Sequence, residues 1–237
     1  MKKILLSLLM APFLFSERTE ELSISPKEED NFISASFRLW IPNELEKTGD
    51  SPIAILVLLP GYNGNGLDLI SNPIWRGIAI EKNWALLGCS IQSENGIVNY
   101  DQPHAGSGRA LEEALLQLGK RFNVDLTKTK LLFFGHSAGG QFGFHFACWK
   151  PERTVGFVAV KGGCYNLDLI TPEARKVPGL WIIGEKDEKW RQEAVKEIVR
   201  EGKKEKAPWN FKIDPNTGHE IGKAESYGLN FFEKLDP

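Results

Sequence analysis

An apolar run that leads into a glycine-flanked serine, and then into a helix-like segment, constrains the fold of this chain most. Residues 131–134 (LLFF) are typical of a buried strand, the pentapeptide GHSAG follows at 135–139, and residues 141–149 favour a helix. So tight a turn needs glycines, because a Cβ at the flanking positions would strike the crossing backbone. The pattern predicts that the hydroxyl of Ser137 is held out at the end of a strand as a candidate nucleophile.

Length and charge narrow the class of protein. The chain has 237 residues and 42% hydrophobic content, enough to bury a sizeable core in one domain. Its 29 Lys and Arg against 31 Asp and Glu give a net charge of -2. Nucleic acids and anionic membranes attract proteins with an excess of positive charge, which this chain lacks, so neither is expected as a partner. The sequence contains no signal for an oligomeric state.

The first residues are typical of an export signal. Lys2 and Lys3 precede the apolar stretch 4–15, which is too short to span a bilayer as a helix. We therefore expect a signal peptide over residues 1–16, a secreted or periplasmic protein, and no membrane span in the mature chain. An uncleaved anchor or a hydrophobic N-terminal helix is the alternative. Residues 17–237 are expected to form a single domain.

Three cysteines, Cys89, Cys148 and Cys164, lack the close spacing of a metal site or a redox pair. Cys89 ends an apolar strand and Cys148 falls late on a predicted helix, so buried thiols are expected there. The sequence leaves open one disulfide. We expect no metal and no cofactor.

Predicted strands and helices alternate along most of the chain. The strands are expected at residues 21–25, 32–41, 53–59, 84–91, 131–134, 155–160, 180–183 and 209–213. The helices are expected at residues 73–83, 107–119, 141–149, around 194–199, and at 222–235. Ser107 is expected to cap the second helix. The first two strands favour an antiparallel pair, and the alternation after them predicts an α/β fold, with a mainly parallel sheet and helices on both faces.

With these elements the chain resembles the α/β-hydrolase family over nearly everything after the leader. In that family an acid follows a later strand and a histidine follows the last strand. Asp187 stands in the loop after residues 180–184, and His219 in the loop after residues 209–213. The resemblance implies a Ser137, Asp187 and His219 triad, in which the histidine accepts the serine proton and the acid orients the imidazole.

Other acids and histidines compete for these roles. Glu185 lies two residues early for the usual spacing, and Asp168 belongs to the preceding loop, a position that some relatives use. Asp214 is explained more simply by surface solvation or by turn formation beside Pro215. The remaining histidines are interpreted as structural: His104, His136 and His145.

The resemblance also implies an oxyanion hole made by the backbone amides of Ala138 and Tyr62. The sequence has Pro60-Gly61 where His-Gly is frequent in the family, which keeps the amide but removes a histidine. The glycines of this loop lack the spacing of a dinucleotide motif and a Walker lysine, so a nucleotide site is not expected.

Residues 124–130 and 135–140 are similar to compact secreted esterases of the dienelactone-hydrolase and polyhydroxybutyrate-depolymerase-like group. This resemblance implies a serine carboxylic-ester hydrolase. A peptidase, a thioesterase or a non-catalytic binding module on the same fold are the alternatives. The segment 161–177 is too short for a cap domain, which favours short-acyl or polymer-attached esters as substrates. The open site is expected to be rimmed by Tyr62, Asn63, Gln92, Tyr165 and Trp190.

Overall fold

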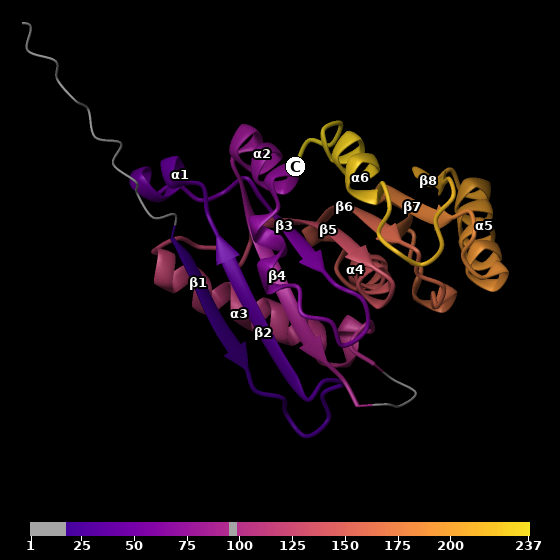
Figure 1. Cartoon of the computed structure of the whole chain (residues 1–237). Helices are drawn as coiled ribbons and strands as arrows, with labels where there is room; N and C mark the ends of the chain where they lie inside the picture. Colours follow the sequence, from indigo (N-terminus) through magenta and orange to yellow (C-terminus); the bar gives the residue numbers. More distant parts are fainter. Residues whose placement is uncertain (1–17, 95–98) are drawn as a thin grey trace, which may run out of the picture.

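A computed structural model describes residues 18–94 and 99–237 of the chain. These residues form an eight-stranded sheet in the order β1-β2-β4-β3-β5-β6-β7-β8, which Figure 1 shows as a twisted layer with helices on both sides. The predicted signal peptide, residues 1–16, lies outside the described part, so it stays a prediction. The expected α/β fold with a mainly parallel sheet is confirmed.

The strands follow the predicted alternation closely. They are β1 (Thr19–Ile24), β2 (Ser34–Trp40), β3 (Ala54–Leu59), β4 (Trp84–Gln92), β5 (Lys130–His136), β6 (Thr154–Val160), β7 (Gly179–Gly184) and β8 (Trp209–Asp214). The pairs β1–β2 and β2–β4 are antiparallel, and every pair from β4 through β3 to β8 is parallel. The central strands β3 and β5 are continuous apolar runs because helices cover both of their faces.

Six α-helices in the described residues pack on the sheet or its ends. They are α1 (Asn43–Thr48), α2 (Pro73–Lys82), α3 (Ser107–Phe122), α4 (Ala138–Trp149), α5 (Lys189–Lys204) and α6 (Ala224–Phe232). Helices α3, α4 and α5 share one apolar core with one face of the sheet, and α2 and α6 share the other. Figure 1 shows α2 and α6 together on one side, with α3 and α4 on the opposite side.

The connection between β6 and β7 carries only two single-turn 3₁₀ segments, η4 (Leu167–Leu169) and η5 (Ala174–Lys176). The helices of the described residues include none that is both long and apolar enough to cross a membrane. Cys89 and Cys148 are buried free thiols, as predicted, and Cys164 is free and exposed, so the disulfide that the sequence left open does not form here.

Candidate active site

Ser137 sits at the carboxyl end of β5, in a backbone conformation that few residues with a side chain adopt. Its φ is 52° and its ψ is -119°, immediately before α4 begins. A Cβ on Gly135 would overlap the backbone of Gly139, and a Cβ on Gly139 would overlap the carbonyl of Pro60. The strand therefore enters the helix only because both glycines lack side chains, and strain of this kind concentrates at functional sites.

Loops from three strands bring Ser137, His219 and Asp187 into one chain of hydrogen bonds. The Nε2 atom of His219 lies 3.0 Å from the Oγ atom of Ser137. On the other side of the ring, Nδ1 lies 3.0 Å from Oδ2 of Asp187. Since an ionised carboxylate only accepts hydrogen bonds, Nδ1 carries the proton and Nε2 is left to accept from the serine.

Asp187 is buried and held by more than the histidine. Its Oδ1 atom accepts a 2.7 Å bond from the amide of Glu188 and a 3.3 Å bond from the guanidinium of Arg191 on α5. Burial by itself raises the pKa of Asp187, but the hydrogen bonds from His219 and Glu188 outweigh it and hold that pKa below its usual value. The carboxylate is therefore ionised at neutral pH. No sequence pattern marks Arg191, which lies one helical turn from Asp187.

The two competing acids lie elsewhere. Glu185 is exposed, and its carboxylate accepts a 2.7 Å bond from the amide of Asn216. Asp168 belongs to η4 and is exposed. Their positions leave Asp187 as the acid that contacts the imidazole.

His136, the residue before Ser137, supports the backbone of the loop at residues 215–223, which carries His219 (the histidine loop). Its Nε2 atom donates to the carbonyl oxygen of His219, and the two rings lie 5.0 Å apart between centroids. Burial lowers the pKa of His136, so the ring is neutral and this tautomer is fixed by the carbonyl that it binds. The structural role expected for His136 is thus fulfilled at the site itself.

A buried ion pair lies beneath the same loop. Lys161 directly follows β6 with a φ of 56°, and its side chain is fully buried beside the fully buried Asp214. The Nζ atom lies 3.4 Å from Oδ2 of Asp214 and 2.9 Å from the hydroxyl of Thr217, and it also binds the carbonyl of Glu220. Of the two explanations expected for Asp214, surface solvation is wrong, because the carboxylate is fully buried against this lysine. The lone lysine after an apolar strand was the available sequence signal.

The loop after β3 is held close to the serine. A Cβ on Gly61 would lie 3.6 Å from Cβ of Ser137. The hydroxyl of Tyr100 donates to the carbonyls of Pro60 and Gly61 at 3.0 and 3.2 Å. Ala138 is the first residue of α4, so its N–H is among those that the helix itself leaves unbound. The predicted oxyanion donors, Tyr62 and Ala138, therefore belong to segments on either side of the serine.

The residues predicted to contact substrate have varied surroundings. The side-chain amide of Asn63 binds the backbone of Ser93 twice: Nδ2 donates to the Ser93 carbonyl at 2.9 Å, and Oδ1 accepts from the Ser93 N–H at 2.8 Å. The hydroxyl of Tyr165 is buried and its ring packs on Phe144, with centroids 5.3 Å apart. The side chains of Asn63 and Tyr165 thus stabilise the loops that carry them through contacts inside the protein.

Gln92 and Trp190 lie on opposite sides of the site. The amide of Gln92 donates to the carbonyl of Gly64 at 3.3 Å, which ties β4 to the loop after β3. Trp190 is 49% exposed at the start of α5, with the guanidinium of Arg191 4.4 Å from its ring centroid. Of the predicted rim residues, Tyr62 and Trp190 present exposed aromatic surface.

A buried polar cluster holds the loop after β6. The side chain of Gln141 donates to Asp101 and accepts from the amides of Gly163 and Cys164, at 3.1 and 3.2 Å. His145 donates from Nδ1 to the carbonyl of Asp101 at 2.7 Å. Burial raises the pKa of Asp101 to about 6 and lowers the pKa of His145 to about 4. His145 therefore has the structural role that the sequence predicted.

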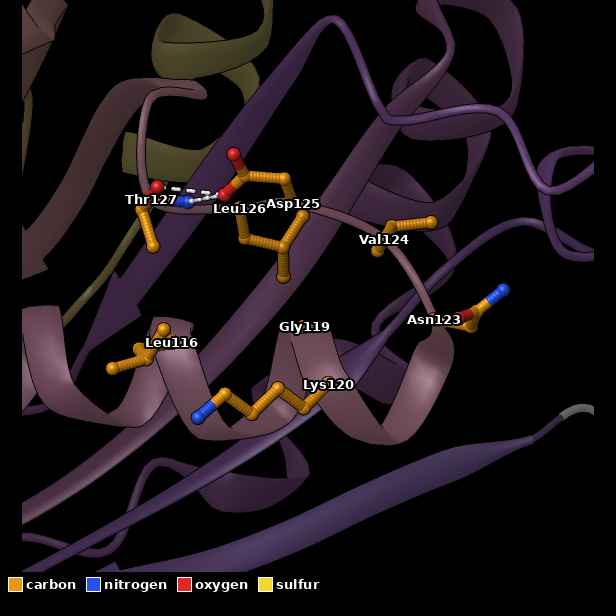
Figure 2. Close-up of a pocket in the computed structure, with 8 residues that line it drawn as sticks. All are labelled: Leu116, Gly119, Lys120, Asn123, Val124, Asp125, Leu126 and Thr127. Carbon is orange, nitrogen blue, oxygen red and sulfur yellow. Dashed lines mark hydrogen bonds between the residues drawn. The ribbon is translucent and has the colours of Figure 1, made fainter.

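Two hollows differ in what surrounds them. One of about 260 Å³ lies beside the turn at residues 135–139 that holds the candidate nucleophile (the nucleophile turn), and it is lined by Gly61 and His136. Another of about 480 Å³ lies between the end of α3 and residues 123–127, and Figure 2 shows Asp125 there bound to Thr127. That second hollow lies near the amino end of β5, whereas Ser137 follows its carboxyl end. Within residues 18–94 and 99–237, no three His, Cys, Asp or Glu side chains are grouped to hold a metal ion.

Comparison with known proteins places the fold. No protein-family model matches the sequence, and no curated protein matches it significantly. Solved structures match over most of the chain. The poly(3-hydroxybutyrate) depolymerase LpqC from Bordetella parapertussis has a TM-score of 0.64 at 14% identity, covering 93% of this chain and 92% of that one.

Two further structures agree. A ferulic acid esterase has a TM-score of 0.64 at 12% identity, covering 92% of this chain and 96% of that one. An S-formylglutathione hydrolase from Agrobacterium tumefaciens has a TM-score of 0.61 at 14% identity, covering 92% and 94%. At such identities the likeness establishes the fold alone, and the chain has the α/β-hydrolase fold.

Proposed function

We propose that this protein is a serine hydrolase of carboxylic esters that works through an acyl-enzyme intermediate. The observation that carries the proposal is the unbroken chain from Ser137 through His219 to Asp187, with 3.0 Å at each link. A serine hydroxyl is a weak nucleophile at neutral pH, and a neutral imidazole within hydrogen-bond distance is the group that activates it.

In the proposed reaction, Oγ of Ser137 attacks the ester carbonyl while Nε2 of His219 takes its proton. The imidazolium is stabilised by the ionised Asp187, and it then protonates the departing alcohol oxygen. The amides of Ala138 and Tyr62 would receive the negative charge that develops on the carbonyl oxygen. A water molecule then attacks the acyl-enzyme carbonyl while His219 takes its proton, and His219 returns that proton to Ser137 as the carboxylic acid is released. Esters are favoured as substrates because the solved neighbours include esterases and a depolymerase of a polyester.

A covalent serine probe separates this proposal from a binding module on the same fold. A fluorophosphonate should label the wild-type protein at Ser137, and both labelling and ester turnover should vanish in Ser137→Ala. Ser226→Ala, a change at an exposed serine on α6, is the matched control and should behave as wild type. If Ser137 is labelled but only thioesters or peptides are turned over, the protein is a thioesterase or a peptidase and not an esterase. No labelling at all would leave a non-catalytic scaffold.

A further inference from the structure

The hollow beside the nucleophile turn is enclosed mainly by apolar and aromatic groups. Its inner wall includes Trp75 and Phe134, which are buried, with ring centroids 4.6 Å apart. Leu69 of η1 (Leu67–Ser71) adds a further apolar side chain. Such a wall offers dispersion and apolar contact and few hydrogen bonds, so it suits an uncharged hydrocarbon group.

The rim of this hollow belongs to the two loops that bracket the reacting atoms. Gly61 lies on one side, where an added Cβ would be 3.3 Å from Nδ1 of His136 and 3.6 Å from Cβ of Ser137. Ile221 lies on the other side, two residues after His219, and is 39% exposed. A group bound in the hollow would therefore lie within a few atoms of an ester carbonyl placed at Ser137.

Size and charge restrict what enters. The hollow holds about 260 Å³, whereas a cavity of roughly 150 Å³ already accommodates a benzene ring. Buried Trp75 and Phe134 close its inner end, so a long chain has no way through. Glu225 lines it too, with its carboxylate bound to Asn72 at 2.7 Å, and this negative charge disfavours anionic groups.

We propose that this pocket, lined by Gly61, Leu69, Trp75, Phe134, His136 and Ile221, binds one neutral apolar group of the substrate, a single ring or a chain of a few carbons. The inference rests on the proposed ester hydrolysis. The group belongs to the acyl or the alcohol portion of the ester, and the experiment distinguishes the two.

The kinetic test uses two series of esters. The first contains acetate esters of linear alcohols from methanol to decanol, together with benzyl acetate. The second contains methyl esters of linear acids from acetic to decanoic acid, together with methyl benzoate. In one series kcat/KM should rise at least tenfold up to about four carbons or one ring, and then fall. Ile221→Trp should narrow the mouth and lower the benzyl-to-methyl or benzoyl-to-acetyl ratio about tenfold. Ile213→Trp, a change at an isoleucine of β8 that is 51% exposed, is the matched control and should leave both ratios unchanged. If Ile221→Trp left both the benzyl-to-methyl and the benzoyl-to-acetyl ratio of kcat/KM at the wild-type value, the inference would be overturned.

A second measurement does not depend on turnover. Wild-type crystals soaked in benzyl alcohol should show its ring against Trp75 and Phe134, and crystals of Ile221→Trp should not. If Ser137 is not labelled and no ester reacts, the proposed function fails while this soak still decides the pocket. In that case, a ring bound in the pocket would still support an apolar binding site, and a pocket without the ring would overturn the inference.

Discussion

At the scale of single residues, the proposed chemistry depends on which nitrogen of His219 carries the proton. Asp187 determines this, because its carboxylate accepts from Nδ1 at 3.0 Å while Arg191 and the amide of Glu188 occupy its other oxygen. The hydrogen bonds that lower the pKa of Asp187 also keep it ionised, so in the proposed reaction it would stabilise the imidazolium that forms during attack.

We expect Asp187→Asn to lower kcat by about a thousandfold to ten-thousandfold, since an amide donating to Nδ1 would place the imidazole proton on Nε2, facing Ser137. Steady-state kinetics on a short ester at pH 7.5 would measure this, with circular dichroism to confirm folding. Asp168→Asn alters the competing acid in η4 and should leave kcat within twofold of wild type. Equal losses in the two variants would contradict the role of Asp187.

Sequence patterns predicted the three residues that the structure joins by hydrogen bonds, because their positions follow from chain order. Ser137 was marked by its flanking glycines, and Asp187 and His219 by the strands before them. Lys161 was missed, and Asp214 was misjudged, because their pairing joins the end of β6 to the end of β8 across the intervening β7. A buried ion pair depends on which strand ends meet in space, which local composition does not encode.

At the scale of elements, the loops that carry the site are tied to one another by buried polar groups. The pair of Lys161 and Asp214 connects the end of β6 to the histidine loop, and the lysine also binds Thr217 and Glu220. One oxygen of Asp214 is buried without a hydrogen-bond partner. Removing the lysine alone would leave that carboxylate uncompensated.

Lys161→Met should therefore lower the free energy of unfolding by about 3–5 kcal/mol, and it should lower kcat because the loop holding His219 loses its support. Urea unfolding and ester kinetics measure the two effects. Adding Asp214→Asn removes the stranded charge and should recover a large part of the stability. Lys203→Met, a change at an exposed position of α5, is the control. A double variant no more stable than Lys161→Met would contradict this account.

The start of α3 shows why some local predictions fail. Ser107 was expected to cap this helix, but it is buried, and its hydroxyl donates to the carbonyl of Tyr100 at 2.7 Å. The prediction was wrong because Asn31, far away in sequence, accepts the Ser107 amide through its side chain at 2.9 Å. Gly106 precedes the helix without a side-chain cap.

The contact between Asp101, which lies before α3, and His145 of α4 leads us to expect a distinctive pH dependence of stability. Burial raises the pKa of Asp101 to about 6, so between about pH 4 and 6 the folded state keeps a proton that the unfolded chain has lost, and stability falls as pH rises. Burial lowers the pKa of His145 to about 4, so over the same window the unfolded chain binds the extra proton, and stability rises with pH. The two contributions oppose each other, and each changes by about 2 kcal/mol across this window.

Asp101→Asn removes one of them. The free energy of unfolding of the variant, minus that of wild type, should increase by about 2 kcal/mol between pH 4 and pH 6, because each end of this range lies close to one of the two pKa values of Asp101. Urea unfolding of both proteins at pH 4, 5 and 6 measures this difference, in which all unchanged groups cancel. A difference independent of pH would show that Asp101 ionises normally.

At the scale of the whole molecule, the position of the site and the brevity of one connection determine what reaches it. Ser137, Asp187 and His219 follow the carboxyl ends of β5, β7 and β8, where the parallel strands of the sheet all end. Between β6 and β7 the described chain has only η4 and η5, so no helical cap is inserted at this point. The alternation of strands and helices made this architecture predictable, because each crossover must cover a face of the sheet.

Between β6 and β7 the described residues form no lid that a lipid surface could open. We expect the rate on a sparingly soluble short-chain ester, such as tributyrin, to rise with dissolved substrate and to level off at its solubility limit. The pocket beside Ser137 ends at Trp75 and Phe134, so long-chain esters should react more slowly even when detergent keeps them dispersed. Initial rates measured across the solubility limit, with Ser137→Ala as the background, test both points. A sharp increase in rate once droplets form would mean that some part of the chain covers the site in solution and withdraws at an interface.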